Sequence, residues 1–95
     1  MEMLEAAGII GRAVRIIEDH GEVGYSPVNF ESAKNYPLVW MRQSESWMKR
    51  YKMDIGKISQ AVSIYADAIK SCDARTVDQA KGMMFISYLA SPDKA

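Results

Sequence analysis

One long row of mainly apolar residues restricts what this chain can fold into more than any other feature of its sequence. Its members follow one another at alternating spacings of three and four residues, the repeat of one helix face. They are Met41, Ser44, Met48, Tyr51, Ile55, Ile58, Val62, Tyr65, Ile69 and Cys72. Because a turn would normally reset the phase of such a row, the pattern favours one helix over residues 38–71. The alternative is a break near Met53-Asp54-Ile55-Gly56, with Asp54 as the N-cap of a new helix.

An amphipathic helix is expected over residues 2–19. Its apolar positions form a broad face that includes Met3, Ala7, Ile10, Val14 and Ile17. Gly21 follows as a residue that can end the helix in the left-handed conformation. Gly8 and Gly11 each cost about 1 kcal/mol relative to Ala inside a helix. Two such glycines in one helix indicate close approach by another backbone.

A third helix is expected over residues 77–91. Thr76 and Gln79 fit a capping box, in which each side chain satisfies a backbone N–H at the start of the helix, and Pro92 stops the helix. Residues 20–37 are rich in Gly, Pro and Asn and are predicted to form a loop. No stretch alternates polar and apolar residues for long enough to make a strand. The sequence therefore predicts an all-α fold, a small bundle of three helices with a long central helix, in a single domain over residues 1–95.

The predicted central helix is too long for a compact monomer. A chain of 95 residues supports one small domain, with a diameter of about 26–30 Å. A helix over residues 38–71 measures roughly 50 Å. Two shorter helices cannot cover its apolar row, in which Cys72 is expected to be buried. We therefore expect a homodimer or a higher homo-oligomer.

The sequence carries no sign of export or of a membrane span. The N-terminal run Met1-Glu2-Met3-Leu4-Glu5 is acidic where a signal or transit peptide carries bases. No apolar stretch approaches the roughly 18–20 residues that a membrane helix needs. A single Cys excludes an internal disulfide and favours a reducing compartment. We expect a cytoplasmic protein that has no membrane partner.

Residues suited to catalysis or metal binding are few. His20 is the only His, and its expected role is to cap the C-terminus of the first helix. One His and one Cys do not make a metal site, and the glycines lack the pattern of a phosphate-binding loop. The sequence predicts neither an enzyme nor a cofactor.

The charge is balanced over the whole chain but not along it. Twelve basic and twelve acidic residues give a net charge of zero, whereas residues 42–57 hold five bases against two acids. Trp40 and Trp47 are seven residues apart and lie on one edge of the same predicted helix. The candidate partner-binding residues are Trp40, Arg42, Trp47, Lys49, Arg50 and Lys52.

This aromatic and cationic stretch admits three interpretations. The tryptophans can be core residues beside a solvated basic face, or they can join the bases in a protein interface, where Trp and Arg are enriched. They can also stack on bases while Lys and Arg follow a phosphate backbone, which would make the edge from Trp40 to Lys57 a weak nucleic-acid-binding module. A local net charge of +3 is below the usual footprint of a nucleic-acid binder. We expect a non-catalytic binding protein that regulates, adapts or inhibits a macromolecular partner.

The C-terminal part of the chain resembles one known family. Ala74-Arg75-Thr76, followed by Gln79, Met83 and Pro92, is similar to the C-terminal helix of small phage proteins that sequester the cyclic nucleotide signals of bacterial defence. The similarity covers residues 74–92. It implies a short, helical, oligomeric protein that binds a small nucleotide, as an alternative function.

Overall fold

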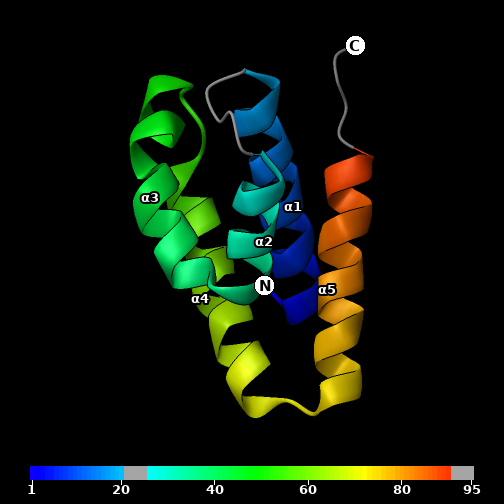
Figure 1. The fold of residues 1–95 in the computed structure, drawn as a ribbon. Coiled ribbons are helices and arrows are strands. Elements are labelled where there is room, and N and C mark those ends of the chain that lie inside the picture. Colours follow the sequence, from blue (N-terminus) through cyan, green and yellow to red (C-terminus); the bar gives the residue numbers. More distant parts are fainter. Residues whose placement is uncertain (21–25, 91–95) are drawn as a thin grey trace.

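Short turns and helices account for almost all of the backbone that the structure describes. The computed structural model describes residues 1–20 and 26–90. In these ranges the helices are α1 (Met3–Asp19), α2 (Ser26–Asn35), α3 (Pro37–Arg50), α4 (Ile55–Ser71) and α5 (Ala74–Leu89) (Figure 1). No strand occurs in these ranges, so the all-α prediction is confirmed, with five helices in place of three.

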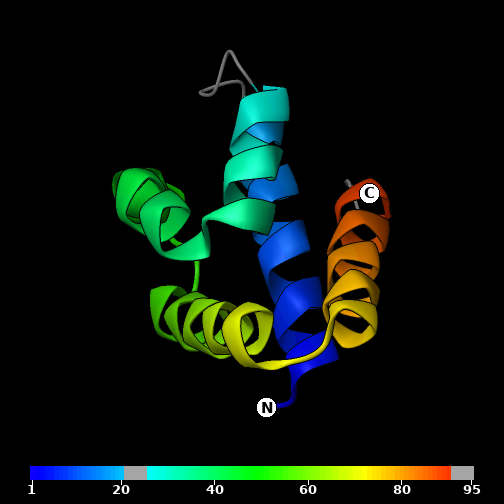
Figure 2. The same ribbon diagram turned by 60° about the horizontal axis from the view of Figure 1, so that its bottom comes forward.

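Helix α1 begins where the sequence predicts because Glu2 caps it. The Glu2 carboxylate accepts hydrogen bonds from the N–H groups of Leu4 and Glu5 at 3.0 and 2.9 Å. The apolar face of α1 is buried and comprises Ala6, Ala7, Ile10, Ala13, Val14 and Ile17. Two views of the ribbon place α1 in the middle of the molecule, between α4 and α5 (Figures 1 and 2).

His20 ends α1, as the sequence predicts. Its backbone N–H donates to the Ile17 carbonyl oxygen at 3.2 Å, and its ring Nδ1 lies 2.9 Å from the Ile16 carbonyl oxygen. Both contacts satisfy carbonyl groups that the end of a helix leaves without partners. Gly21, expected to end the helix, lies outside the described residues.

Helix α5 packs closely against α1 at two glycines. A Cβ atom on Gly11 would lie 2.2 Å from the Met84 carbonyl oxygen, a contact with α5 backbone. A Cβ atom on Gly8 would lie 3.1 Å from the Ser87 Oγ atom. The close backbone approach predicted from these glycines is therefore confirmed at Gly11, while Gly8 faces a side chain.

The prediction of one helix over residues 38–71 is wrong. The chain forms two helices, α3 and α4, separated by residues 51–54. Asp54 caps α4, and its carboxylate accepts a hydrogen bond from the Lys57 N–H at 3.1 Å. The alternative of a break with Asp54 as N-cap is the arrangement that forms.

The end of α3 explains why the chain turns there without a glycine. Lys52 adopts the left-handed conformation with φ of 57°. The Met53 N–H donates to the Met48 carbonyl oxygen at 2.9 Å, and the Lys52 N–H donates to the Lys49 carbonyl oxygen at 3.2 Å. This pair of hydrogen bonds is a Schellman motif. The apolar row continues across the break because both helices face the core with the same side of the row. Met48 of α3 and Ile58, Val62 and Tyr65 of α4 are buried there.

Helix α2 lies within residues 20–37, where the sequence predicts a loop. Phe30 and Ala33 bury its inner side, and the Tyr65 hydroxyl of α4 donates to the Lys34 carbonyl oxygen at 2.6 Å. Contacts with other helices therefore stabilise a segment whose Pro and Asn content is typical of a turn.

Helix α5 begins earlier than its expected start. Asp73 is the N-cap, and its carboxylate accepts a hydrogen bond from the Thr76 N–H at 2.9 Å. The capping box predicted at Thr76 and Gln79 is therefore wrong, since both residues lie inside the helix. Cys72, expected in the core, is exposed because α4 ends at Ser71 and Cys72, its C-cap, has an extended backbone that leaves the helix face.

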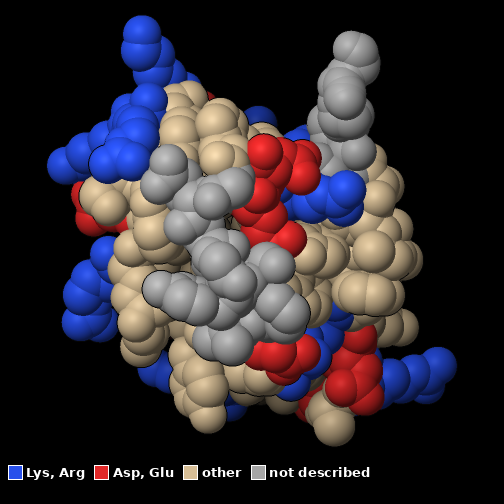
Figure 3. Space-filling view, turned by 45° about the horizontal axis from the view of Figure 1, so that its top comes forward, with Lys and Arg blue, Asp and Glu red and all other residues tan. Residues whose placement is uncertain are grey.

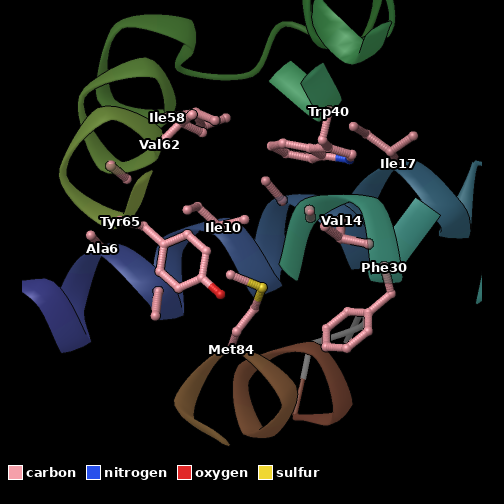
Figure 4. Packing of buried hydrophobic residues seen from close by; sticks show 14 of the residues in the cluster. Ala6, Ile10, Val14, Ile17, Phe30, Trp40, Ile58, Val62, Tyr65 and Met84 are labelled. Carbon is pink, nitrogen blue, oxygen red and sulfur yellow. The ribbon is translucent and has the colours of Figure 1, made fainter. Parts of the chain in front are cut away.

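The core lies where α1 meets the other helices. Its largest fully buried side chains include Trp40, Tyr65, Ile10 and Met84, from α3, α4, α1 and α5 (Figure 4). The molecule measures 35 × 24 × 23 Å along its principal axes. A helix of roughly 50 Å was the reason to expect a homo-oligomer. Because α3 and α4 are two shorter helices, that reason does not apply, and the oligomer stays a prediction.

Candidate binding surface on helix α3

The outer face of α3 carries side chains that the core does not use. Leu38 and Val39 are 51% and 44% exposed near its N-terminus. Arg42, Lys49 and Arg50 are exposed further along the helix. Helical geometry places these five residues on one side, opposite the buried residues of α3. We call them the α3 face.

Trp40 belongs to the core and not to this face. Its side chain is 0% exposed, and its indole N–H donates to the Asn29 Oδ1 atom at 2.9 Å. Figure 4 shows the indole pointing inward beside Ile17. The prediction that Trp40 contacts a partner is therefore wrong. Trp47 is half-buried and packs against the core, so a partner can reach only its outer edge.

The ion pair of Lys49 on α3 is long and exposed. Lys49 Nζ lies 3.9 Å from Glu45 Oε2, the long end of the range for an ion pair, and both groups face solvent. Arg42 and Lys52 form no ion pair within the described residues. Figure 3 shows Lys and Arg side chains (blue) gathered on the left of the molecule, the side that α3 forms.

An open cleft lies between α1 and the turn that joins α3 to α4. Its volume is about 390 Å³. Apolar side chains line part of it, from Ile9, Ala13, Ile16, Met53 and Ile58, and polar side chains line the rest, from Arg12, Tyr51, Lys52, Asp54 and Lys57. The Tyr51 ring stacks on the His20 ring, with centroids 3.6 Å apart and planes 13° apart. This stacking holds the C-terminal end of α1 against the turn beside the cleft.

Sequence reasoning places Lys52 among the candidate residues and Lys57 in the same basic stretch, but it misses Arg12 as their neighbour. Arg12 is exposed on α1, and Lys57 follows the N-cap of α4. Lys57 already belongs to the basic stretch of residues 42–57, but no local spacing links Arg12 to it, because Arg12 is forty residues or more away. Only the packing of α4 on α1 brings them to one cleft.

Metal-binding groups and membrane helices are absent from the part of the chain that the structure describes. No group of three His, Cys, Asp or Glu side chains in it is placed to hold a metal ion. None of its helices is both long and apolar enough to cross a membrane.

Comparisons with known proteins place the chain in no family. No family model matches it, and neither a curated protein nor a solved structure matches it. They give no support to the resemblance of residues 74–92 to small phage proteins, which stays a prediction. The function is therefore argued from the surface of the molecule.

Proposed function

We propose that this protein is a non-catalytic binding protein that attaches its α3 face to an acidic surface of a protein partner. One observation carries the proposal. Exposed apolar side chains, Leu38 and Val39, and exposed cations, Arg42, Lys49 and Arg50, share one side of one helix. The buried residues of α3 lie on its opposite side.

The apolar half of the α3 face favours a protein over a nucleic acid. Tyr36 is 66% exposed beside Leu38 and Val39, so the apolar area continues into the residue before the helix. Buried apolar contacts and aromatic anchors are typical of protein interfaces. Residues 37–50 hold three bases against one acid, fewer than binding along a phosphate backbone requires.

The cationic half selects an acidic partner. Arg42 carries a planar guanidinium that can bind a carboxylate through two parallel hydrogen bonds. Lys49 is held only loosely by Glu45, at 3.9 Å, so a partner carboxylate can replace that contact at little cost. The partner surface that fits is a small apolar patch flanked by Asp or Glu.

The proposal predicts that neutralising the cationic half weakens partner binding. The test variant is Arg42→Gln with Lys49→Gln, and the control is Lys70→Gln with Arg75→Gln, which lowers the charge equally on α4 and α5. Two exposed charges give a loss of roughly threefold to tenfold in affinity. A partner is captured from the native host and identified, and its Kd is then measured by isothermal titration calorimetry for the parent and both variants.

A second pair of variants separates a protein partner from a polyanion. Leu38→Ala with Val39→Ala should weaken binding to an acidic protein, because it removes the apolar contact, and should leave binding to nucleic acid unchanged. Phe85→Ala with Ile86→Ala removes exposed apolar area from α5 and serves as the control. Equal Kd values for the parent and both α3 variants would refute the proposal, as would a partner that nuclease treatment releases.

A further inference from the structure

The cleft between α1 and the turn of residues 51–54 has the size and the openness of a ligand-binding site. Its volume of about 390 Å³ falls within the range of roughly 300–1,000 Å³ that small-molecule sites occupy. It is open to solvent where α1 meets the turn and the start of α4, which lie about forty residues further along the chain.

Three cations lie around this cleft. Arg12 comes from α1, Lys52 from the turn and Lys57 from α4. In the described part of the chain, no carboxylate lies within ion-pairing distance of any of the three. The one acid among the lining residues, Asp54, already caps α4. Like charges placed together repel one another, so a bound anion would lower the energy of the arrangement.

The rest of the lining is suited to an apolar group. Ile9, Ala13 and Ile16 of α1 face Met53 and Ile58 across the cleft. Apolar side chains beside a few converging charges are the usual composition of a small-molecule site.

Tyr51 and Lys52, in the turn at the edge of the cleft, both have unusual local structure. The Tyr51 hydroxyl is buried and has no hydrogen-bond partner among the described residues. Buried hydroxyl groups nearly always have one, so Tyr51 is an exception among the residues that line the cleft. Lys52 holds a left-handed φ of 57° that Gly adopts at lower cost, and such strained residues cluster at binding sites.

We propose that this cleft binds a small organic anion that carries an apolar or aromatic ring system. The anionic group lies among Arg12, Lys52 and Lys57, and the rings cover the apolar side chains of α1. The site is separate from the α3 face, because neither Arg12 nor Lys57 belongs to that face. The two proposals can therefore fail independently.

A pair of dyes that differ in one charged group tests this proposal. Anilinonaphthalene sulfonate has the aromatic rings and the anion, and phenylnaphthylamine has the same rings without the sulfonate. Fluorescence titration of the parent protein should show one molecule of the sulfonate dye bound. The variant Arg12→Gln with Lys57→Gln should bind it about tenfold more weakly, because two charge-assisted contacts are lost, and should bind the neutral dye as the parent does.

The control variant is Lys70→Gln, which removes a lysine from a smaller apolar groove beside Pro37 and Ile69. It should bind both dyes as the parent does, and circular dichroism should show each variant folded. Amide chemical shifts in the parent should change at Ile9, Tyr51 and Ile58 when the sulfonate dye is added. The proposal is overturned if the parent protein does not bind the sulfonate dye, or if the cleft variant binds this dye as tightly as the parent does. It is also overturned if the cleft variant binds both dyes more weakly than the parent does, by the same factor.

Discussion

Glu18 joins α1 to α5 through a polar contact that is partly shielded from water. The Tyr88 hydroxyl donates to its carboxylate, and Arg15 donates to the Tyr88 carbonyl oxygen at 3.0 Å. Burial raises the pKa of Glu18, and this effect outweighs the Tyr88 hydrogen bond and the charge of Arg15, which both lower it. The charge of Asp19 adds a small further rise. The folded protein therefore binds the Glu18 proton more tightly than the unfolded chain does.

We predict that Glu18→Gln makes stability less dependent on pH. The raised pKa means that the contribution of Glu18 is fully present below its ordinary pKa of 4.5 and is lost as the pH rises through the folded value. Gln still accepts a hydrogen bond from Tyr88 but does not titrate. Urea unfolding between about pH 4 and pH 7 should show the stability of the parent falling relative to that of the variant.

The control for this prediction is Glu5→Gln, which removes an exposed carboxylate from the same helix. It tests whether loss of one negative charge on α1 is enough to change the pH profile. A difference between parent and Glu18→Gln that is constant over the whole pH range would show that the folded and unfolded pKa values are equal.

At the scale of single elements, we predict that Lys52→Gly stabilises the protein. Lys pays a steric penalty of roughly 1–2 kcal/mol in the left-handed conformation, whereas Gly does not. Part of this gain is offset by the greater freedom of Gly in the unfolded chain, which leaves a net gain of about 0.5–1 kcal/mol. The free energy of unfolding from urea titration measures the change.

The matched control is Lys49→Gly, three residues earlier in α3. The same substitution inside a helix should destabilise by about 1 kcal/mol, so the two variants should differ in sign. Loss of stability in both would contradict the left-handed ending of α3.

The helices differ in how much of them can be predicted from the sequence. Helix α1 is predictable because its apolar face and its C-terminal capping residue, His20, indicate the same helix. The break after α3 is harder to predict, because Lys52 ends the helix where Gly is the usual signal. Helix α2 is the hardest, since a hydrogen bond between the Trp40 indole and Asn29 and another from Tyr65 to Lys34 help to hold it. Such contacts exist only once the fold has formed.

At the scale of the whole molecule, the packing of α5 rests mainly on α1. We predict that Gly11→Ala destabilises the protein, because the new methyl group meets the Met84 carbonyl oxygen at 2.2 Å and the α5 backbone must move. Overpacking of this kind costs typically 1–3 kcal/mol, more than the gain of about 1 kcal/mol from the better helix propensity of Ala. Thermal unfolding followed by circular dichroism gives the change in Tm.

Gly82→Ala on α5 should have the opposite effect on stability from Gly11→Ala on α1. Apart from the neighbouring backbone of α5 itself, no described atom lies within 4 Å of a Cβ placed on Gly82, so helix propensity decides and the variant should gain up to about 1 kcal/mol. Equal effects at Gly11 and Gly82 would contradict the close packing of α1 on α5.

Parts of the candidate sites can be predicted from the periodicity of one helix, and other parts depend on how the helices pack. Exposure of Arg42, Lys49 and Arg50 follows from helix geometry, because the apolar row defines the opposite side. The burial of Trp40 does not follow, because it depends on where α1 and α2 lie. The meeting of Arg12 with Lys57 also depends on packing between helices.

The position of Cys72 offers a practical route to these measurements. It is the only thiol in the chain, it is exposed, and it follows the C-terminal end of α4, whereas the cleft lies at the N-terminal end of the same helix. The helix between them spans roughly 25 Å. A maleimide fluorophore attached there would report rotational diffusion, and hence complex formation, from the opposite end of α4. Energy transfer from Trp40 and Trp47, both on α3, to the same fluorophore would follow the distance between α3 and the far end of α4.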